Sequence, residues 1–89
     1  MEHELKTDSE VFEAVMLGVK PWEIRKNDRG YEVGDILNLR ETKYTGIEMS
    51  QGKALIYTGR EVKVRVMYIL PGPIYDLIDG WCVMTTECI

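Results

Sequence analysis

The first regular hydrophobic pattern in the chain predicts a helix over about residues 8–17. Its apolar positions recur at helical spacing and are Val11, Phe12, Val15 and Met16. Thr7 and Glu10 have the spacing of a capping box, and Gly18 stands where a helix can end in the left-handed conformation. A short edge strand over residues 3–6 is expected to precede this helix.

Alternation of apolar and polar positions predicts further strands over residues 22–26, 36–41, 61–70 and 81–86. In the first of them, Trp22 and Ile24 share one face and Glu23 and Arg25 share the other, as in a half-buried strand. In the strongest strand the apolar face holds Val62, Val64, Val66 and Tyr68. Trp81 can stack a base, but the preferred interpretation is that it packs in the core with Val83, because the two share a face.

The remaining segments are rich in turn residues. The composition of residues 42–59 predicts a long loop or a ragged hairpin, and residues 74–79 are expected to form a single helical turn. One helix and about five short strands favour a mainly β (α+β) fold: a small, closed or nearly closed barrel that leaves few exposed edges. The length of 89 residues fits a single domain, residues 1–89.

Composition narrows the protein class. No apolar run is long enough to span a bilayer and no secretion signal is visible, so we expect a cytoplasmic protein without membrane contact. Cys82 and Cys88 are interpreted as free thiols, the first in the core and the second in the tail. Two thiols with no histidine nearby cannot complete a tetrahedral metal site, and the sequence indicates no cofactor.

The net charge of -4 is unevenly distributed. Residues 1–19 and 66–89 are acidic, whereas residues 20–65 carry ten basic and seven acidic side chains. An acidic protein is a poor candidate for strong, sequence-blind nucleic-acid binding, which depends on many cations. A basic middle segment is compatible with one small cationic pocket.

The densest polar cluster follows the predicted helix. Glu23 and Arg25 share a strand face, and Lys20 lies in the turn before them, stiffened by Pro21. Cation, anion and cation around a small volume can hold a phosphate, a carboxylate or a polar base edge. The alternative interpretation is a solvated strand face with an internal ion pair.

The pattern Gly-x-Lys-x-x-Glu-x-Arg, present as Gly18, Lys20, Glu23 and Arg25, resembles the signature of the ASCH domain family, relatives of the PUA RNA-binding barrel. Further matching segments are residues 3–6, 25–29, 33–35, 57–60 and 80–81, which together resemble a compact bacterial and phage subfamily. The resemblance implies a PUA-like barrel, a cleft between helix and barrel lined by the signature, and RNA as the proposed ligand.

Some small bacterial ASCH proteins hydrolyse acylated cytidine. In them a Thr stands where this chain has Glu23, and a Lys matching Lys20 activates it. A carboxylate cannot replace the hydroxyl nucleophile in that mechanism, so the resemblance at Lys20 does not carry the activity over.

The sequence thus predicts an RNA- or nucleotide-binding module. The expected ligand-binding residues are Lys20, Glu23, Arg25, Asn27, Asp28, Arg29, Tyr57 and Arg60. Tyr57 is placed in a loop, where it can stack a base. One alternative is a nucleoside-modifying amidohydrolase with Lys20 as base and Glu23 as proton carrier. Another is a bacterial or phage protein-interaction module that uses residues 42–59.

Overall fold

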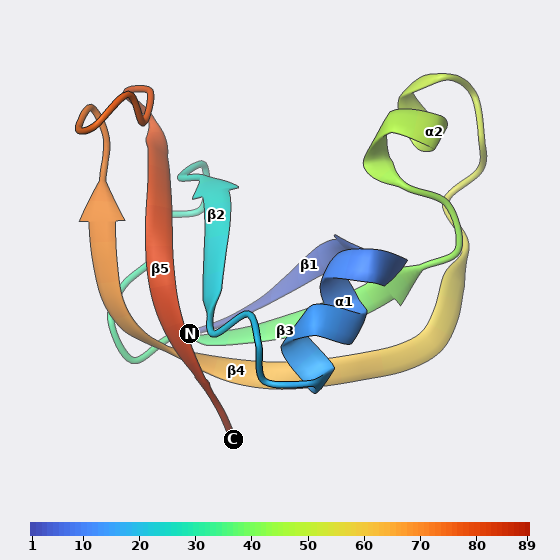
Figure 1. The fold of residues 1–89 in the computed structure, drawn as a ribbon, viewed down its shortest axis with the longest axis horizontal. Coiled ribbons are helices and arrows are strands. Elements are labelled where there is room, and N and C mark those ends of the chain that lie inside the picture. Colours follow the sequence, from blue (N-terminus) through green and yellow to red (C-terminus); the bar gives the residue numbers. More distant parts are fainter.

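A computed structural model describes all of residues 1–89 and shows one five-stranded sheet with two helices (Figure 1). In chain order the elements are β1 (Glu2–Asp8), α1 (Ser9–Met16), β2 (Trp22–Lys26), β3 (Ile36–Thr42), α2 (Gly46–Ser50), β4 (Tyr57–Pro71) and β5 (Trp81–Cys88). The sheet order is β1-β3-β4-β5-β2, with β1 parallel to β3 and every other pair antiparallel. The predicted mainly β class and the five strands are confirmed.

The sheet curls into a half-barrel that is open between its two edge strands, β1 and β2 (Figure 1). The long strand β4 makes this curvature possible, because it pairs with β3 along one half and with β5 along the other. Apolar side chains from β1, α1, β3, β4 and β5 fill the concave side. The buried cluster is Leu5, Val15, Tyr31, Leu37, Leu39, Val64, Val66, Cys82 and Met84.

Helix α1 confirms the predicted amphipathic segment and its end. Phe12 and Val15 are buried, and Gly18 follows the helix with a φ of 76°. The predicted capping box is wrong: Asp8 occupies the N-cap without a side-chain bond, because β1 extends through Thr7 and buries that residue. A capping box does form elsewhere, between Thr45 and Glu48 at the start of α2.

The faces of β4 and β5 differ in part from the predicted pattern. Val64 and Val66 are buried as expected, but the register shifts between Val66 and Tyr68, and Tyr68 is 60% exposed. A bulge adds one residue, which reverses the side-chain alternation beyond it. In β5 the core takes Cys82 and Met84, so the expected core position of Trp81 is wrong.

Two connecting segments were also predicted incorrectly. Residues 42–59 contain α2 and the first residues of β4, so Tyr57 lies in a strand rather than a loop. Residues 74–79 form no helical turn; Tyr75 and Asp76 have φ values of 48° and 65°, and Ile74 and Leu77 make an isolated bridge. These conformations turn the chain sharply between β4 and β5.

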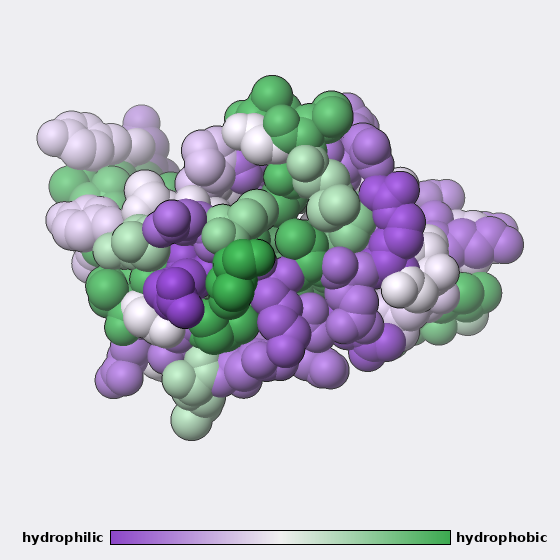
Figure 2. Space-filling model, turned by 90° about the horizontal axis from the view of Figure 1, so that it is seen from below, coloured by the Kyte–Doolittle hydropathy of each residue, from purple (hydrophilic) through white to green (hydrophobic).

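The surface mixes apolar and charged side chains. Figure 2 shows one face, seen from below relative to Figure 1, on which green hydrophobic side chains lie directly beside purple hydrophilic ones. Neither helix is long and apolar enough to cross a membrane.

Candidate functional site

Strand β2 directs Glu23 and Arg25 toward the interior, which reverses the simplest interpretation of its alternating pattern. Glu23 is paired with Met84 and Arg25 with Cys82, and both partners belong to the buried core. Cross-strand partners share a face of the sheet. Glu23 is therefore 2% exposed, whereas Ile24, on the opposite face, is 47% exposed. The interpretation of Glu23 and Arg25 as a solvated strand face is wrong.

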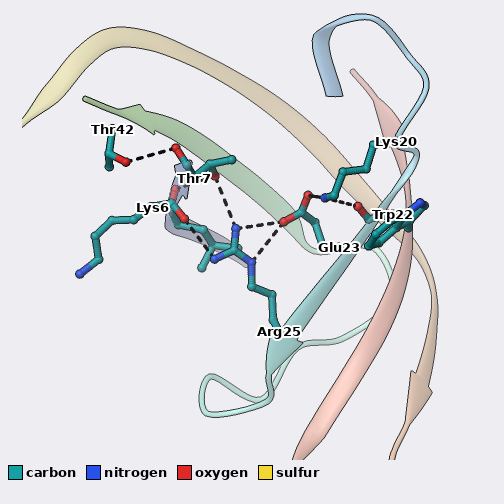
Figure 3. A network of polar contacts seen from close by, with 8 residues as sticks. Lys6, Thr7, Lys20, Trp22, Glu23, Arg25 and Thr42 are labelled. Carbon is teal, nitrogen blue, oxygen red and sulfur yellow. Dashed lines mark hydrogen bonds and ion pairs between the residues drawn. The ribbon is translucent and has the colours of Figure 1, made fainter. Parts of the chain in front are cut away.

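Glu23 is the centre of a polar network with a cation on each side (Figure 3). Lys20 Nζ donates to Glu23 Oε2 at 2.6 Å, and Arg25 Nε and Nη2 donate to Glu23 Oε1 at 3.2 and 3.0 Å. Both oxygens of this buried carboxylate are thus hydrogen-bonded to a cation, as burial of a charge requires. The structure brings the three predicted residues together.

Lys20 is held by its own turn. The chain leaves α1 through Gly18, and Lys20 Nζ lies 2.7 Å from the carbonyl oxygen of Trp22 and 4.6 Å from the centre of the Trp22 ring. These contacts fix the ammonium group at the rim of the sheet, with its side chain 12% exposed. Trp22 is 42% exposed, and its ring packs against this lysine.

Arg25 also spans the opening between the two edge strands. Its Nη1 donates to the carbonyl oxygen of Lys6 at 3.1 Å, and its Nη2 lies 3.4 Å from Thr7 Oγ1, both in β1 (Figure 3). Arg29 Nη1 donates in the same way to the carbonyl oxygen of Glu4 at 2.8 Å. Two guanidinium groups therefore bind carbonyls of β1 where no neighbouring strand pairs with it.

A cavity of about 300 Å³ lies beside this network. Its walls come from β1, the start of α1, the turn after α1 and β2; they are Lys6, Thr7, Asp8, Val11, Lys20, Trp22, Glu23, Ile24 and Arg25. A larger and wider hollow of about 640 Å³ lies along α1, but no predicted site residue lines it. The smaller cavity is therefore the better candidate site.

The other predicted residues divide into two groups. Asp28 and Arg29 line a second cavity that also contains Arg25, and Asn27 Oδ1 accepts from the backbone N–H of Tyr31 at 3.1 Å, closing the turn before it. Tyr57 and Arg60 line neither of these two cavities.

Tyr57 and Arg60 make contacts of their own elsewhere in the fold. The guanidinium carbon of Arg40 lies 3.7 Å from the centre of the Tyr57 ring, over its face. Arg60 pairs with Glu13 at 2.7 Å and with Glu41 at 3.5 Å, and the hydrogen bond with Glu13 is the main reason why the pKa of Arg60 is raised. Neither residue is brought to the Lys20 network.

Sequence reasoning missed several participants. Thr7 and the Lys6 carbonyl bind Arg25, yet nothing in the local pattern indicates that β1 faces β2 across an opening. A separate buried cluster was also missed: His3 Nε2 lies 2.8 Å from Asp35 Oδ2. Burial alone would raise the pKa of Asp35, but hydrogen bonds from His3, the Glu32 backbone and the N-terminal ammonium lower it to about 2.

Two further groups have pKa values shifted by their surroundings. A hydrogen bond from Thr58 Oγ1, assisted by one from Ser9, lowers the pKa of Glu41, and burial raises the pKa of the Cys82 thiol. Cys82 is buried and Cys88 exposed, both unpaired, as predicted. No group of three or more His, Cys, Asp or Glu side chains is arranged to hold a metal ion.

Comparison with known proteins gives two matches. A family model described as "Domain of unknown function (DUF3850)" matches residues 2–86, which include the whole Lys20 network. An "Uncharacterized 12.9 kDa protein in GpA 3'region" of Escherichia phage P2 is 41% identical over 64 residues. That match covers 72% of this chain and 50% of the phage protein, so the chain spans about half the length of this curated relative.

Proposed function

This chain belongs to the family described as Domain of unknown function (DUF3850), and we propose that it binds RNA or a nucleotide-like ligand in the cavity between β1 and β2. The observation that carries the proposal is the convergence of Lys20 and Arg25 on buried Glu23 at the wall of that cavity. The resemblance of the Gly18, Lys20, Glu23 and Arg25 pattern to the ASCH signature supports the same ligand class.

Glu23 acts as the positioning residue in this proposal. Both of its oxygens already accept from cations, so it has little capacity left to read a base edge. Holding two long cationic side chains in one geometry before the ligand arrives reduces the entropy cost of binding. The geometry therefore favours orientation of the two cations as the role of Glu23 over direct contact with the ligand.

The number of unused N–H donors limits how many hydrogen bonds Lys20 and Arg25 can make with a ligand. An ammonium group has three N–H donors, and Lys20 uses two of them, on Glu23 and on the Trp22 carbonyl. A guanidinium has five, and Arg25 uses four, two on Glu23 and one each on Lys6 and Thr7. One donor remains on each side chain, which fits a single phosphate or carboxylate.

The amidohydrolase alternative has less support from this geometry. A general base must reach the hydroxyl or water that it deprotonates, whereas Lys20 Nζ is directed at Glu23 and at the Trp22 carbonyl. The one hydroxyl that lines this cavity, Thr7 Oγ1, lies 3.4 Å from Arg25 Nη2 and has no hydrogen bond with Lys20. The protein-interaction alternative would use α2 and its flanking residues, where Ile47 is 72% exposed.

Fluorescence anisotropy with a short labelled oligouridylate tests the proposal. We expect Lys20→Gln and Arg25→Gln each to weaken binding by about fivefold or more, because each loses a contact to a charged group. Arg65→Gln is the matched control, since Arg65 is exposed on β4 and has no ion pair. Circular dichroism confirms that each variant is folded. Equal binding by all four proteins would exclude this cavity as the site.

The salt dependence gives an independent readout. If one to three phosphates of a single strand are contacted, the logarithm of the association constant should fall linearly with the logarithm of the salt concentration. The expected slope is between about -0.7 and -2. A much steeper slope would indicate diffuse binding to the whole basic segment, and no slope would indicate that the protein neutralises no phosphate of the oligonucleotide.

A further inference from the structure

A second cavity of about 280 Å³ lies on the other side of the Arg25 side chain. Arg25 and Ile24 line both cavities, so the two hollows follow one another along β2 with the guanidinium between them. The second cavity is lined on its basic side by Lys26 and Arg29 and at its rim by Trp81, which is 37% exposed. It opens along the same gap between β1 and β2.

The second cavity holds more free hydrogen-bond donors than the Lys20 network does. Arg29 uses one of five N–H donors, on the Glu4 carbonyl, and Lys26 makes no side-chain hydrogen bond or ion pair. Asp28 is the one carboxylate that lines this cavity. The second cavity therefore has more cationic donors than carboxylate acceptors, which suits phosphate groups. The exposed indole of Trp81 can stack against a base.

The two tryptophans mark the ends of this double cavity. Trp22 lines the first, Trp81 lines the second, and Trp81 is the cross-strand partner of Lys26. Lys26 comes four positions after Trp22 in β2, which corresponds to a distance of about 13 Å at the rise of an extended chain. Bases in a stacked single strand rise by about 3.4 Å each, so one nucleotide is too short to reach both rings.

We infer that the ligand is a single-stranded nucleic acid several nucleotides long, lying along the opening between β1 and β2 and occupying both cavities. The inference rests on the proposed function and adds a second subsite: one base contacts Trp22, a later base contacts Trp81, and Lys26 and Arg29 bind the phosphates of the second part. Arg25, between the two cavities, contacts the backbone that joins them.

Tryptophan fluorescence can be measured for each subsite separately, because the chain contains two tryptophans and one lies at each cavity. Trp22→Phe leaves Trp81 as the sole emitter, and Trp81→Phe leaves Trp22. The probes are uridine monophosphate and tetrauridylate, with tetrathymidylate as the DNA arm. We expect the monophosphate, which is too short to reach both rings, to change the emission of one tryptophan only, and the tetranucleotide to change the emission of both.

A charge variant tests the second subsite without touching the first. Lys26→Gln is expected to weaken tetrauridylate binding by about fivefold or more and to leave any monophosphate response of Trp22 unchanged. Arg65→Gln is again the control. Because Lys26 is exposed and has no partner, this variant is expected to fold normally.

The possible results separate the two proposals. If tetrauridylate changes Trp22 emission but not Trp81 emission, and Lys26→Gln binds like the wild type, the second subsite is wrong while the first cavity stands. If neither tryptophan responds to any probe, both proposals are wrong. Equal responses to tetrauridylate and tetrathymidylate support the subsite and show that the 2′-hydroxyl is not read.

Discussion

Replacement of Glu23 by glutamine is the most informative single change to this protein. The side chain keeps its shape and an acceptor oxygen but loses the charge that neutralises Lys20 and Arg25. At a separation of about 3 Å and an effective dielectric of about 20, each ion contact is worth about 5 kcal/mol before desolvation is subtracted. Removal of one partner from a buried ion pair costs about 3–5 kcal/mol in measured cases.

The expected loss here is smaller because the two cations reach solvent. The side chains of Lys20 and Arg25 are 12% and 24% exposed, so water can compensate them in part. We therefore expect Glu23→Gln to lower the free energy of unfolding by about 2–4 kcal/mol. For a chain of this size, with a urea m-value of about 1–1.5 kcal/mol/M, the unfolding midpoint should fall by about 2 M.

Urea denaturation followed by circular dichroism at neutral pH measures this shift. The matched control is Glu2→Gln, which also removes a strand carboxylate from an ion pair, with Lys63 at 3.2 Å, but at 45% exposure. Surface pairs of this kind contribute about 0–1 kcal/mol. If Glu23→Gln is no more destabilising than Glu2→Gln, the buried carboxylate does not hold the two cations, and the argument for an organised site fails.

Three further predictions follow from other parts of the fold. Asp35 has a pKa of about 2 in the folded chain, below its ordinary 3.8, so its stabilisation is complete above about pH 4 and is lost as the pH falls toward 2. Its exposed N-terminal partner limits the loss to about 1–2 kcal/mol, and urea unfolding of Asp35→Asn should show a weaker pH dependence over this range. Arg25→Lys keeps the charge but loses the fork that reaches Lys6 and Thr7, so amide hydrogen exchange should accelerate in β1 and β2; unchanged exchange there would mean that Arg25 does not join the edges. With a thiol reagent, exposed Cys88 should react at once and Cys82 only on unfolding, because Cys82 is buried and its pKa is raised; two fast thiols would contradict the described β5.

Much of the secondary structure could be predicted from the sequence because local patterns determine it. The strand Trp22–Lys26 was predicted at its observed bounds, and Gly18 ends α1 in the left-handed conformation as its position indicated. The buried valines Val64 and Val66 follow from strict alternation. Each of these features depends on neighbouring residues alone.

Local patterns failed where a long-range contact competes with them. Thr7 and Glu10 have the right spacing for a capping box, but pairing of Thr7 with Glu41 of β3 keeps it in strand β1. The bulge near Tyr68 is not visible in the alternation of β4 because it depends on the register with β5. Arg60 was expected among the ligand-binding residues, but ion pairs with Glu13 and Glu41 hold it elsewhere.

The sequence by itself determined the three residues at the centre of the candidate site, since the spacing of Lys20, Glu23 and Arg25 places them in one turn and on one strand face. It did not determine which face of that strand meets the interior, because alternation defines two faces and is symmetric between them. Only the tertiary structure decided this, by pairing Glu23 with Met84 and Arg25 with Cys82. The inward face of this edge strand borders an opening rather than the closed core, so charged side chains can lie there and bind one another and the opposite edge.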